Sequence, residues 1–198
     1  MRNGIIITVL FACLIGSSLL FYAGWELIIV GLLCVLFAFL YTTGPYPLSY
    51  NGWGDILVIV FFGFVPVGGT YYVQALTWTT DTTIASLICG LLIDTLLVVN
   101  NYRDREADAR SGKRTVIVRF GEKFGSYLYL MLGMTASLLC FWFLFEGHLY
   151  AALLPLLYLI PHFLTWKRMV RIHSGKKLNS ILGETSRNML LMGILLSI

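Results

Sequence analysis

Long apolar runs recur along this chain. Residues 4–22 contain no charged side chain, and similar runs follow near 27–43, 56–76, 82–99, 126–145 and 148–166. A helix of about 17–25 such residues crosses a bilayer core of about 30 Å. A last run begins near Asn188 and stops at Ile198, which is too short to span unless its helix starts earlier. The pattern predicts an all-α, polytopic transmembrane helix bundle with six full spans and one partial span.

Composition supports lipid as the solvent for much of the surface. Hydrophobic residues make up 58% of the chain and charged residues 12%, against about 25% charged in a soluble domain. The alternative for residues 4–22 is a cleaved signal peptide after Met1-Arg2-Asn3. The run is longer than the usual apolar core of such a peptide, and no A-x-A-like site follows it, so a membrane span is favoured.

The basic residues predict the orientation. Six spans that start inside give inside segments at 1–3, 43–55, 100–125 and 167–187, and these hold all 14 Lys and Arg residues. The outside turns contain Glu26, Asp81 and Glu146 but no basic residue. This asymmetry is typical of cytoplasmic loops, so we expect the inside segments to lie on the cytoplasmic side of the membrane. It also explains the net charge of +4, and we expect no nucleic-acid partner.

Several small or helix-breaking residues lie inside the predicted spans. Pro66 in the third span and Pro155 and Pro161 in the sixth should kink their helices. Broken helices either line a cavity or reflect irregular packing, and both interpretations stay open. Gly90 and Gly133 are small enough to permit close contact between helices. The four cysteines lie in separate spans without a C-x-x-C pair, which is typical of small apolar residues rather than disulfides.

The stretch from Asn100 to Thr115 is the strongest candidate for chemistry. Asn100, Asp104 and Asp108 are spaced i, i+4, i+8, so a helix turning about 100° per residue places them on one face. Two carboxylates one turn apart repel each other unless a cation lies between them. Mg²⁺ prefers one or two carboxylates plus phosphate oxygens from a substrate. Lys113 and Arg114 follow and supply positive charge for a phosphate.

The alternative is a basic juxtamembrane loop whose acidic residues form surface salt bridges. A P-loop is excluded, because that motif requires Gly at 107 and Ser or Thr at 114, where the chain has Ala107 and Arg114. Asp94 lies within the fourth span and is therefore a functional candidate. It either supports the wall of a pocket or is hydrogen-bonded to a neighbouring helix. Asp55 opens the third span and suits the positive end of that helix.

The order N-x-x-x-D-x-x-x-D followed by G-K-R-T resembles the UbiA-type intramembrane prenyltransferase superfamily. The segments G-P-Y-P-L-S-Y-N-G-W-G-D and N-N-Y-R-D-R-E-A-D-A-R-S-G-K-R-T resemble its branch that prenylates 1,4-dihydroxy-2-naphthoate in menaquinone synthesis. The resemblance implies a bundle of nine helices around a cavity. It also implies that Mg²⁺ ionises a polyprenyl diphosphate and that the allylic group is transferred to the aromatic ring, giving demethylmenaquinone.

The resemblance also assigns roles to individual residues. It implies that Asp104 and Asp108 are metal ligands and that Tyr46 and Tyr50 lie near the leaving group as catalytic residues. Tyr50 stands where related enzymes carry a lysine. The implied substrate-binding residues are Asn100, Asn101, Arg103, Lys113 and Arg114. The expected cofactor is therefore Mg²⁺, and the expected partners are a polyprenyl diphosphate, 1,4-dihydroxy-2-naphthoate and the lipid bilayer.

The resemblance covers residues 1–198 as a single transmembrane domain, but without the family's first two helices and first Asn/Asp motif. We therefore expect either a fragment of a longer enzyme or a product that is inactive alone. A CDP-alcohol phosphotransferase is disfavoured, because its motif has Gly four residues before Asp104, where Asn100 stands. The remaining alternative is a non-catalytic membrane subunit or a transporter-like helix bundle.

Overall fold

The computed structural model describes residues 2–198, with side chains from Gly4 onward. Met1 and the side chain of Arg2, both in the predicted inside segment 1–3, lie outside this part. The first half of the chain forms α1 (Arg2–Ser17), α2 (Leu20–Ala23), α3 (Glu26–Thr42), η1 (Leu48–Tyr50), α4 (Gly54–Val58), η2 (Ile59–Gly68), α5 (Gly69–Ala75) and α6 (Thr80–Arg110). The second half forms α7 (Val116–Phe120), α8 (Glu122–Leu139), α9 (Trp142–Phe145), α10 (Leu149–Leu153), η3 (Leu154–Tyr158), α11 (Leu159–Ile172), η4 (Lys176–Leu178) and α12 (Asn179–Leu196).

The predicted membrane helix bundle is confirmed. Within the described part of the chain, five helical stretches are long and apolar enough to cross a membrane: Gly4–Ala23, Gly54–Ala75, Thr80–Arg110, Glu122–Phe145 and Leu149–Ile172. The predicted span at 27–43 corresponds to the shorter apolar helix α3, which has 17 residues. The predicted partial span is longer than expected, because α12 begins at Asn179 rather than near Asn188. Its first turns are polar, which is why an apolar run alone does not reveal them.

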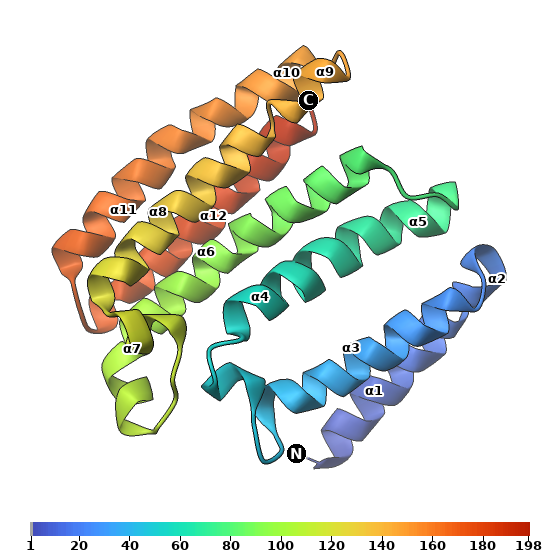
Figure 1. The fold of residues 1–198 in the computed structure, drawn as a ribbon, viewed down its shortest axis with the longest axis horizontal. Coiled ribbons are helices and arrows are strands. Elements are labelled where there is room, and N and C mark those ends of the chain that lie inside the picture. Colours follow the sequence, from blue (N-terminus) through green and yellow to red (C-terminus); the bar gives the residue numbers. More distant parts are fainter. Residues whose placement is uncertain (1) are drawn as a thin grey trace.

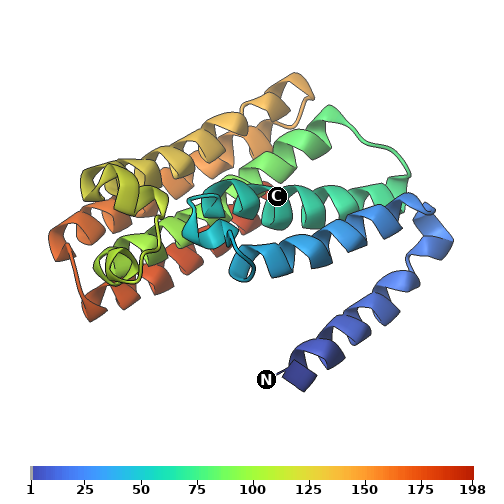
Figure 2. The same ribbon diagram turned by 60° about the horizontal axis from the view of Figure 1, so that its bottom comes forward.

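Helix α6 lies at the centre of the bundle (Figure 1). It packs against η2 and α4 on one side and against α8 and α12 on the other. Its buried residues Ile88, Val98, Val99 and Tyr102 belong to the main hydrophobic core. Helix α1 diverges from the other helices (Figure 2) and contacts only α2 and α3 among the more extensive helix pairs.

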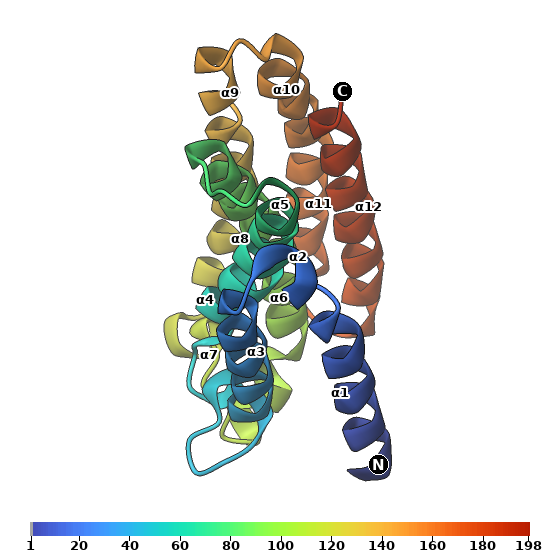
Figure 3. The same ribbon diagram turned by 90° about the vertical axis from the view of Figure 1, so that its right-hand side faces the viewer.

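The helices run roughly along one common direction (Figure 3). The N-terminus, the segment between α3 and α4, and α7 all lie at one end of the bundle, and the turns between α5 and α6 and between α9 and α10 lie at the other (Figure 3). Because the segments at 43–55 and 100–125 meet at the first end, we call it the basic end. This arrangement agrees with the predicted alternation of inside and outside segments.

Glycines set the contact between η2 and α6. A Cβ atom at Gly63 would lie 2.4 Å from the carbonyl oxygen of Ser86, and one at Gly90 would lie 2.8 Å from the carbonyl oxygen of Ile59. The predicted close contact at Gly90 is therefore confirmed. Pro66 lies in η2, which is a π-helix over Ile59–Gly68. Since proline lacks a backbone N–H and its ring clashes with an α-helical carbonyl, the wider π-helical turn replaces the α-helix here.

The sixth span is interrupted at Pro155, where η3 separates α10 from α11. The side chain of His162 lies just beyond, in contact with Gly133 of α8. The His162 Nδ1 and the Tyr158 hydroxyl are 2.9 Å apart, and His162 Nε2 is 3.2 Å from the carbonyl oxygen of Leu130. These groups are buried, so hydrogen bonding removes the cost of placing them in the bundle interior.

We predict that Gly63→Ala destabilises the bundle and that Gly69→Ala does not. The added methyl group at Gly63 meets backbone atoms of α6, whereas nothing lies within 4 Å of a Cβ at Gly69. Overpacking of this kind costs about 1–3 kcal/mol, and both variants gain the same helix propensity. Thermal unfolding in detergent, followed by circular dichroism, measures the difference. Equal melting temperatures for the two variants would contradict the close contact.

Candidate functional site

The polar end of α6 extends beyond its apolar part. The helix has 31 residues, which corresponds to roughly 46 Å at about 1.5 Å per residue, whereas a bilayer core is about 30 Å thick. Its apolar part ends at Val99, so the turns from Asn100 to Arg110 project beyond the core at the basic end. The predicted extension of the fourth span into the interface is therefore present, and it carries most of the candidate site.

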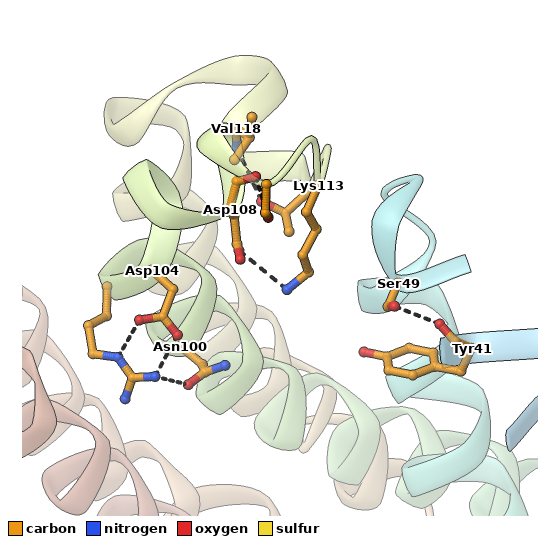
Figure 4. A network of polar contacts seen from close by, with 10 residues as sticks. Tyr41, Ser49, Asn100, Asp104, Asp108, Lys113 and Val118 are labelled. Atoms are coloured by element: carbon orange, nitrogen blue, oxygen red, sulfur yellow. Dashed lines mark hydrogen bonds and ion pairs between the residues drawn. The ribbon is translucent and has the colours of Figure 1, made fainter. Parts of the chain in front are cut away.

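Arg103 binds both Asn100 and Asp104 on this extension. Its Nε donates to Asp104 Oδ1 at 2.7 Å, and its Nη2 donates to Asp104 Oδ2 at 2.6 Å and to Asn100 Oδ1 at 2.7 Å. Its Nη1 donates to the Asn179 side chain at 3.0 Å, which connects α6 to the start of α12. The two side chains of the predicted row that lie nearest the membrane are therefore held by one guanidinium group (Figure 4).

The hydrogen bonds from Arg103 keep Asp104 ionised. They hold the pKa of the Asp104 carboxyl group below its usual range, although partial burial acts in the opposite direction. The positive charges of Arg103 and Lys113 add to this effect. At neutral pH the Asp104 carboxylate is therefore negatively charged, and a metal ion would compete with Arg103 rather than with a proton.

Asp108 turns toward a different cation. After α6 ends at Arg110, Gly112 adopts a φ of 78°, a left-handed conformation that favours glycine. The chain reverses there, and the Lys113 backbone N–H donates to the Asp108 carbonyl oxygen at 2.9 Å. The Lys113 ammonium group then lies 3.3 Å from Asp108 Oδ2 (Figure 4). The pairing of Lys113 with the row follows from this turn.

The two segments singled out in the sequence meet at the basic end. The Arg114 backbone N–H donates to the Tyr50 carbonyl oxygen at 2.7 Å, and Arg119 Nη2 donates to the Asn51 carbonyl oxygen at 2.7 Å. Gly52 has a φ of 81°, and a Cβ atom there would lie 3.1 Å from the Arg114 carbonyl oxygen. The segment between α3 and α4 is thereby fixed beside Lys113.

Arg105 belongs to a separate cluster. Its Nη2 donates to Glu122 at 2.8 Å, and its Nη1 donates to the carbonyl oxygen of His173 at 3.0 Å. Its guanidinium group also lies over the Tyr102 ring, 4.7 Å from the centroid. These contacts join the basic ends of α6, α8 and α11, so Arg105 braces the bundle while Arg103 faces the row.

Of the two predicted tyrosines, Tyr50 is held at the basic end through its backbone, because its carbonyl oxygen accepts from the Arg114 N–H. Tyr46 and Tyr50 are 56% and 41% exposed. Tyr41, near the end of α3, points toward α6 (Figure 4). Its backbone carbonyl oxygen accepts from Ser49 Oγ at 2.6 Å, which fixes the start of the same segment.

Sequence reasoning missed Tyr41 and Asn179. A hydroxyl-bearing ring near the basic end of an apolar span was the available signal for Tyr41. No sequence signal pointed to Asn179, because its contact with Arg103 depends on where α12 begins. Asn101, a predicted substrate-binding residue, is 4% exposed, and Arg114 lies at the surface.

The donor atoms of the row suit a hard cation. Asn100, Asp104 and Asp108 offer only oxygen ligands, and Mg²⁺ is commonly bound through one or two carboxylates together with phosphate oxygens of a substrate. Among the residues whose side chains are described, no three His, Cys, Asp or Glu residues converge on one point. The row therefore fits a metal that takes its remaining ligands from elsewhere, and it does not form a closed protein cage.

Comparison with known proteins finds a matching family model and several similar proteins. A model of the UbiA prenyltransferase family matches residues 2–189. A 1,4-dihydroxy-2-naphthoate octaprenyltransferase of Escherichia coli (strain K12) is 39% identical over 146 residues, which cover 71% of this chain and 47% of that protein. The protein of the same name from Mycobacterium tuberculosis (strain ATCC 25618 / H37Rv) is 43% identical over 119 residues, or 60% of this chain and 40% of that protein.

A more distant relative is a 2-carboxy-1,4-naphthoquinone phytyltransferase of Synechocystis sp. (strain ATCC 27184 / PCC 6803 / Kazusa), which is 27% identical over 92 residues, or 46% of this chain and 30% of that protein. The chain spans less than half of the length of each of these curated relatives. No solved structure matches it significantly.

We predict that Gly52→Ala loosens the contact between the two segments more than Gly112→Ala does. Both glycines have positive φ, so the conformational cost of about 1 kcal/mol is shared, but only Gly52 lies against Arg114 and Arg119. Hydrogen exchange of the backbone N–H groups of residues 113–121 measures the loosening. Faster exchange in Gly112→Ala than in Gly52→Ala would contradict this picture of the joined segments.

Proposed function

The chain belongs to the UbiA prenyltransferase family, and on this premise we propose that it acts in transfer of a polyprenyl group from a polyprenyl diphosphate to 1,4-dihydroxy-2-naphthoate, giving demethylmenaquinone. The names of the bacterial relatives support this acceptor and this donor class. The observation that carries the proposal is the row of Asn100, Asp104 and Asp108 with Arg103 and Lys113 bound to it.

The row and its cations are suited to a diphosphate. Arg103 offers a planar fork of donors that matches phosphate oxygens, and Lys113 offers a compact charge. Both now bind carboxylates on α6. When a diphosphate arrives, these two side chains exchange the carboxylates for its oxygens, and their charge stabilises the negative charge that develops on the leaving group. Asn100 orients a further oxygen through its amide.

Mg²⁺ is the metal that we propose for this site. Asp104 and Asp108 would hold it, with Asn100 beside them, as their oxygen donors suggest. When bound, Mg²⁺ supplies Lewis-acid stabilisation of the departing diphosphate. When Arg103 and Lys113 leave these carboxylates, both cations can bind the diphosphate. Asp104 and Asp108 are then free to bind the metal.

An apolar cleft supports a long isoprenoid tail in the donor. The cleft has a volume of about 900 Å³ and lies between α6, α10 and α12. Cys89 and Ile93 line it from α6. Helical geometry places Cys89 within about 20° of Asn100 and Ile93 within about 20° of Asp104, since each pair is separated by eleven residues. A tail in the cleft would therefore follow the same face of α6 as the diphosphate site.

We further propose that the basic end faces the cytoplasm and that the protein lies in the bacterial inner membrane. The distribution of basic residues supports this orientation. The diphosphate group of the donor is highly charged and water-soluble. A site at the basic end would therefore meet this group on the cytoplasmic side.

We predict that Asp104→Asn and Asp108→Asn each lower Mg²⁺-dependent binding of farnesyl diphosphate by at least about tenfold, as expected when a charged ligand group is lost. Glu106→Gln is the matched control, because Glu106 is exposed on the same turns of α6. Binding of labelled farnesyl diphosphate to the protein in lipid nanodiscs, with Mg²⁺ and with a chelator, provides the measurement.

Unchanged Mg²⁺-dependent binding in both aspartate variants would remove the proposed metal site. A transporter-like bundle or a non-catalytic subunit has no reason to show Mg²⁺-dependent binding, so its complete absence in the wild-type chain would favour those alternatives. Loss in Glu106→Gln equal to that in the aspartate variants would indicate a non-specific effect of charge.

A further inference from the structure

Asp94 is a buried acid that the diphosphate site does not use. It lies in the apolar part of α6, is 1% exposed, and its Oδ1 atom has no hydrogen-bond partner. The alternative that Asp94 is hydrogen-bonded through this atom to a neighbouring helix is therefore wrong for this structure. A buried, unpaired carboxylate oxygen is costly in a membrane protein, so it points to a ligand that supplies a hydrogen.

Two further polar groups lie near Asp94, where α3 and α4 approach α6. The charge of Asp55 acts on Asp94, and both carboxyl groups act on the hydroxyl of Tyr41. Asp55 lies in the first turn of α4 and Tyr41 near the end of α3. A Cβ atom at Gly54 would lie 3.5 Å from the Tyr41 hydroxyl and 3.4 Å from Leu97 of α6. Three helices thus meet at this cluster, which consists of Tyr41, Asp55 and Asp94.

The cluster lies deeper in the membrane than the diphosphate site. Asn100 is six residues beyond Asp94, which is about 9 Å along the helix axis and about 120° around it. Asp108 is fourteen residues beyond Asp94 and lies within about 40° of the same direction, so the cluster shares a face of α6 with the Asp108 end of the row. The Tyr41 side chain points toward α6 (Figure 4).

We propose that this cluster binds a hydroxyl group of the aromatic acceptor, with Asp94 Oδ1 as the hydrogen-bond acceptor. The inference rests on the proposed function, because it takes the acceptor to be a hydroxylated aromatic ring. Beyond the proposed function, it states where the acceptor ring binds and which residue selects for its hydroxyl group. The hydroxyl binds at Asp94, one to two helical turns below the diphosphate, and the ring lies against Tyr41 between the two levels.

The buried oxygen of Asp94 selects for a hydroxyl group on the acceptor. A site built around a buried acceptor oxygen rejects an analogue that lacks the hydroxyl, because the oxygen is then left unpaired.

The test compares two neutral probes, 1,4-dihydroxynaphthalene under reducing, anaerobic conditions and 1,4-dimethoxynaphthalene. Their binding to the whole chain in nanodiscs is measured by equilibrium dialysis, with empty nanodiscs as the background. We expect the wild-type chain to prefer the diol by at least about tenfold, the usual cost of leaving a buried acceptor oxygen unpaired. Asp94→Leu should reduce this preference to near unity, and Asp94→Asn, which keeps an acceptor oxygen, should retain part of it.

Glu146→Gln is the matched control, because it removes an exposed carboxylate at the opposite end of the bundle, and it should keep the wild-type preference. A wild-type chain without preference, or an Asp94→Leu variant with wild-type circular dichroism and unchanged preference, would overturn the proposal. If Asp94→Leu does not fold, Asp94→Asn decides: a reduced preference supports the proposal and an unchanged one overturns it.

Binding of farnesyl diphosphate in the same samples separates this inference from the proposed function. Asp94→Leu should retain Mg²⁺-dependent diphosphate binding while it loses the preference for the diol. Loss of both in a folded variant would overturn a specific role for Asp94 in the acceptor site. A wild-type chain that prefers the diol but does not bind the diphosphate would contradict the proposed function and leave the aromatic site standing.

Discussion

The mismatch between the length of α6 and the thickness of a bilayer core determines the rest of the structure. A membrane interior requires every backbone polar group to be paired, which a helix achieves within itself, and it disfavours charged side chains, so the spanning part of α6 is largely apolar apart from Asp94. The apolar part of α6 satisfies this condition and forms the centre of the core with Val98 and Val99. The remaining turns must leave the core, and they carry Asn100, Asp104 and Asp108 out together on a rigid helix.

The ion pairs on these turns are well placed but weak. Side chains of Arg103 and Asp104 remain 24% and 38% exposed, and exposed pairs contribute only about 0–1 kcal/mol. A doubly charged metal with a diphosphate offers far stronger interactions to the same groups. The pairs therefore keep the site charge-balanced and ordered, and a diphosphate can displace them at little cost. Asn179 matters here, because it holds Arg103 at the row from a second helix.

Much of the fold could be predicted because a helix that crosses lipid requires a long apolar run, which is easily recognised in the sequence. The apolar runs gave the spans and the basic residues gave the two ends. The start of α12 could not be read in this way, since its first turns around Glu184 and Arg187 are polar. The π-helix over Ile59–Gly68 was predicted only as a break at Pro66, because its type depends on packing against α6.

The common face of the three site residues on α6 could be predicted from the sequence, but the side chains that bind them could not. The i, i+4, i+8 spacing fixed the common face of Asn100, Asp104 and Asp108 through helix geometry alone. The pairing of Arg103 with Asp104 depends on rotamers and on a distant asparagine, which no local pattern encodes. The role that the resemblance gives to Tyr46 and Tyr50 stays a prediction. Tyr41 could not be placed from the sequence, because its position depends on how the following segment folds back through Ser49.

The most direct test of the account is a transfer assay in membranes that contain this chain, co-expressed with a segment that carries the family's first two helices and first Asn/Asp motif. The membranes receive 1,4-dihydroxy-2-naphthoate, farnesyl diphosphate and Mg²⁺, and prenylated naphthoquinone is quantified by mass spectrometry for the wild-type chain and for Asp104→Asn at equal expression. The account predicts product from the wild-type chain and at least about a hundredfold less from the variant, since the variant loses transition-state stabilisation. Equal amounts from the two, including none from either, would contradict it.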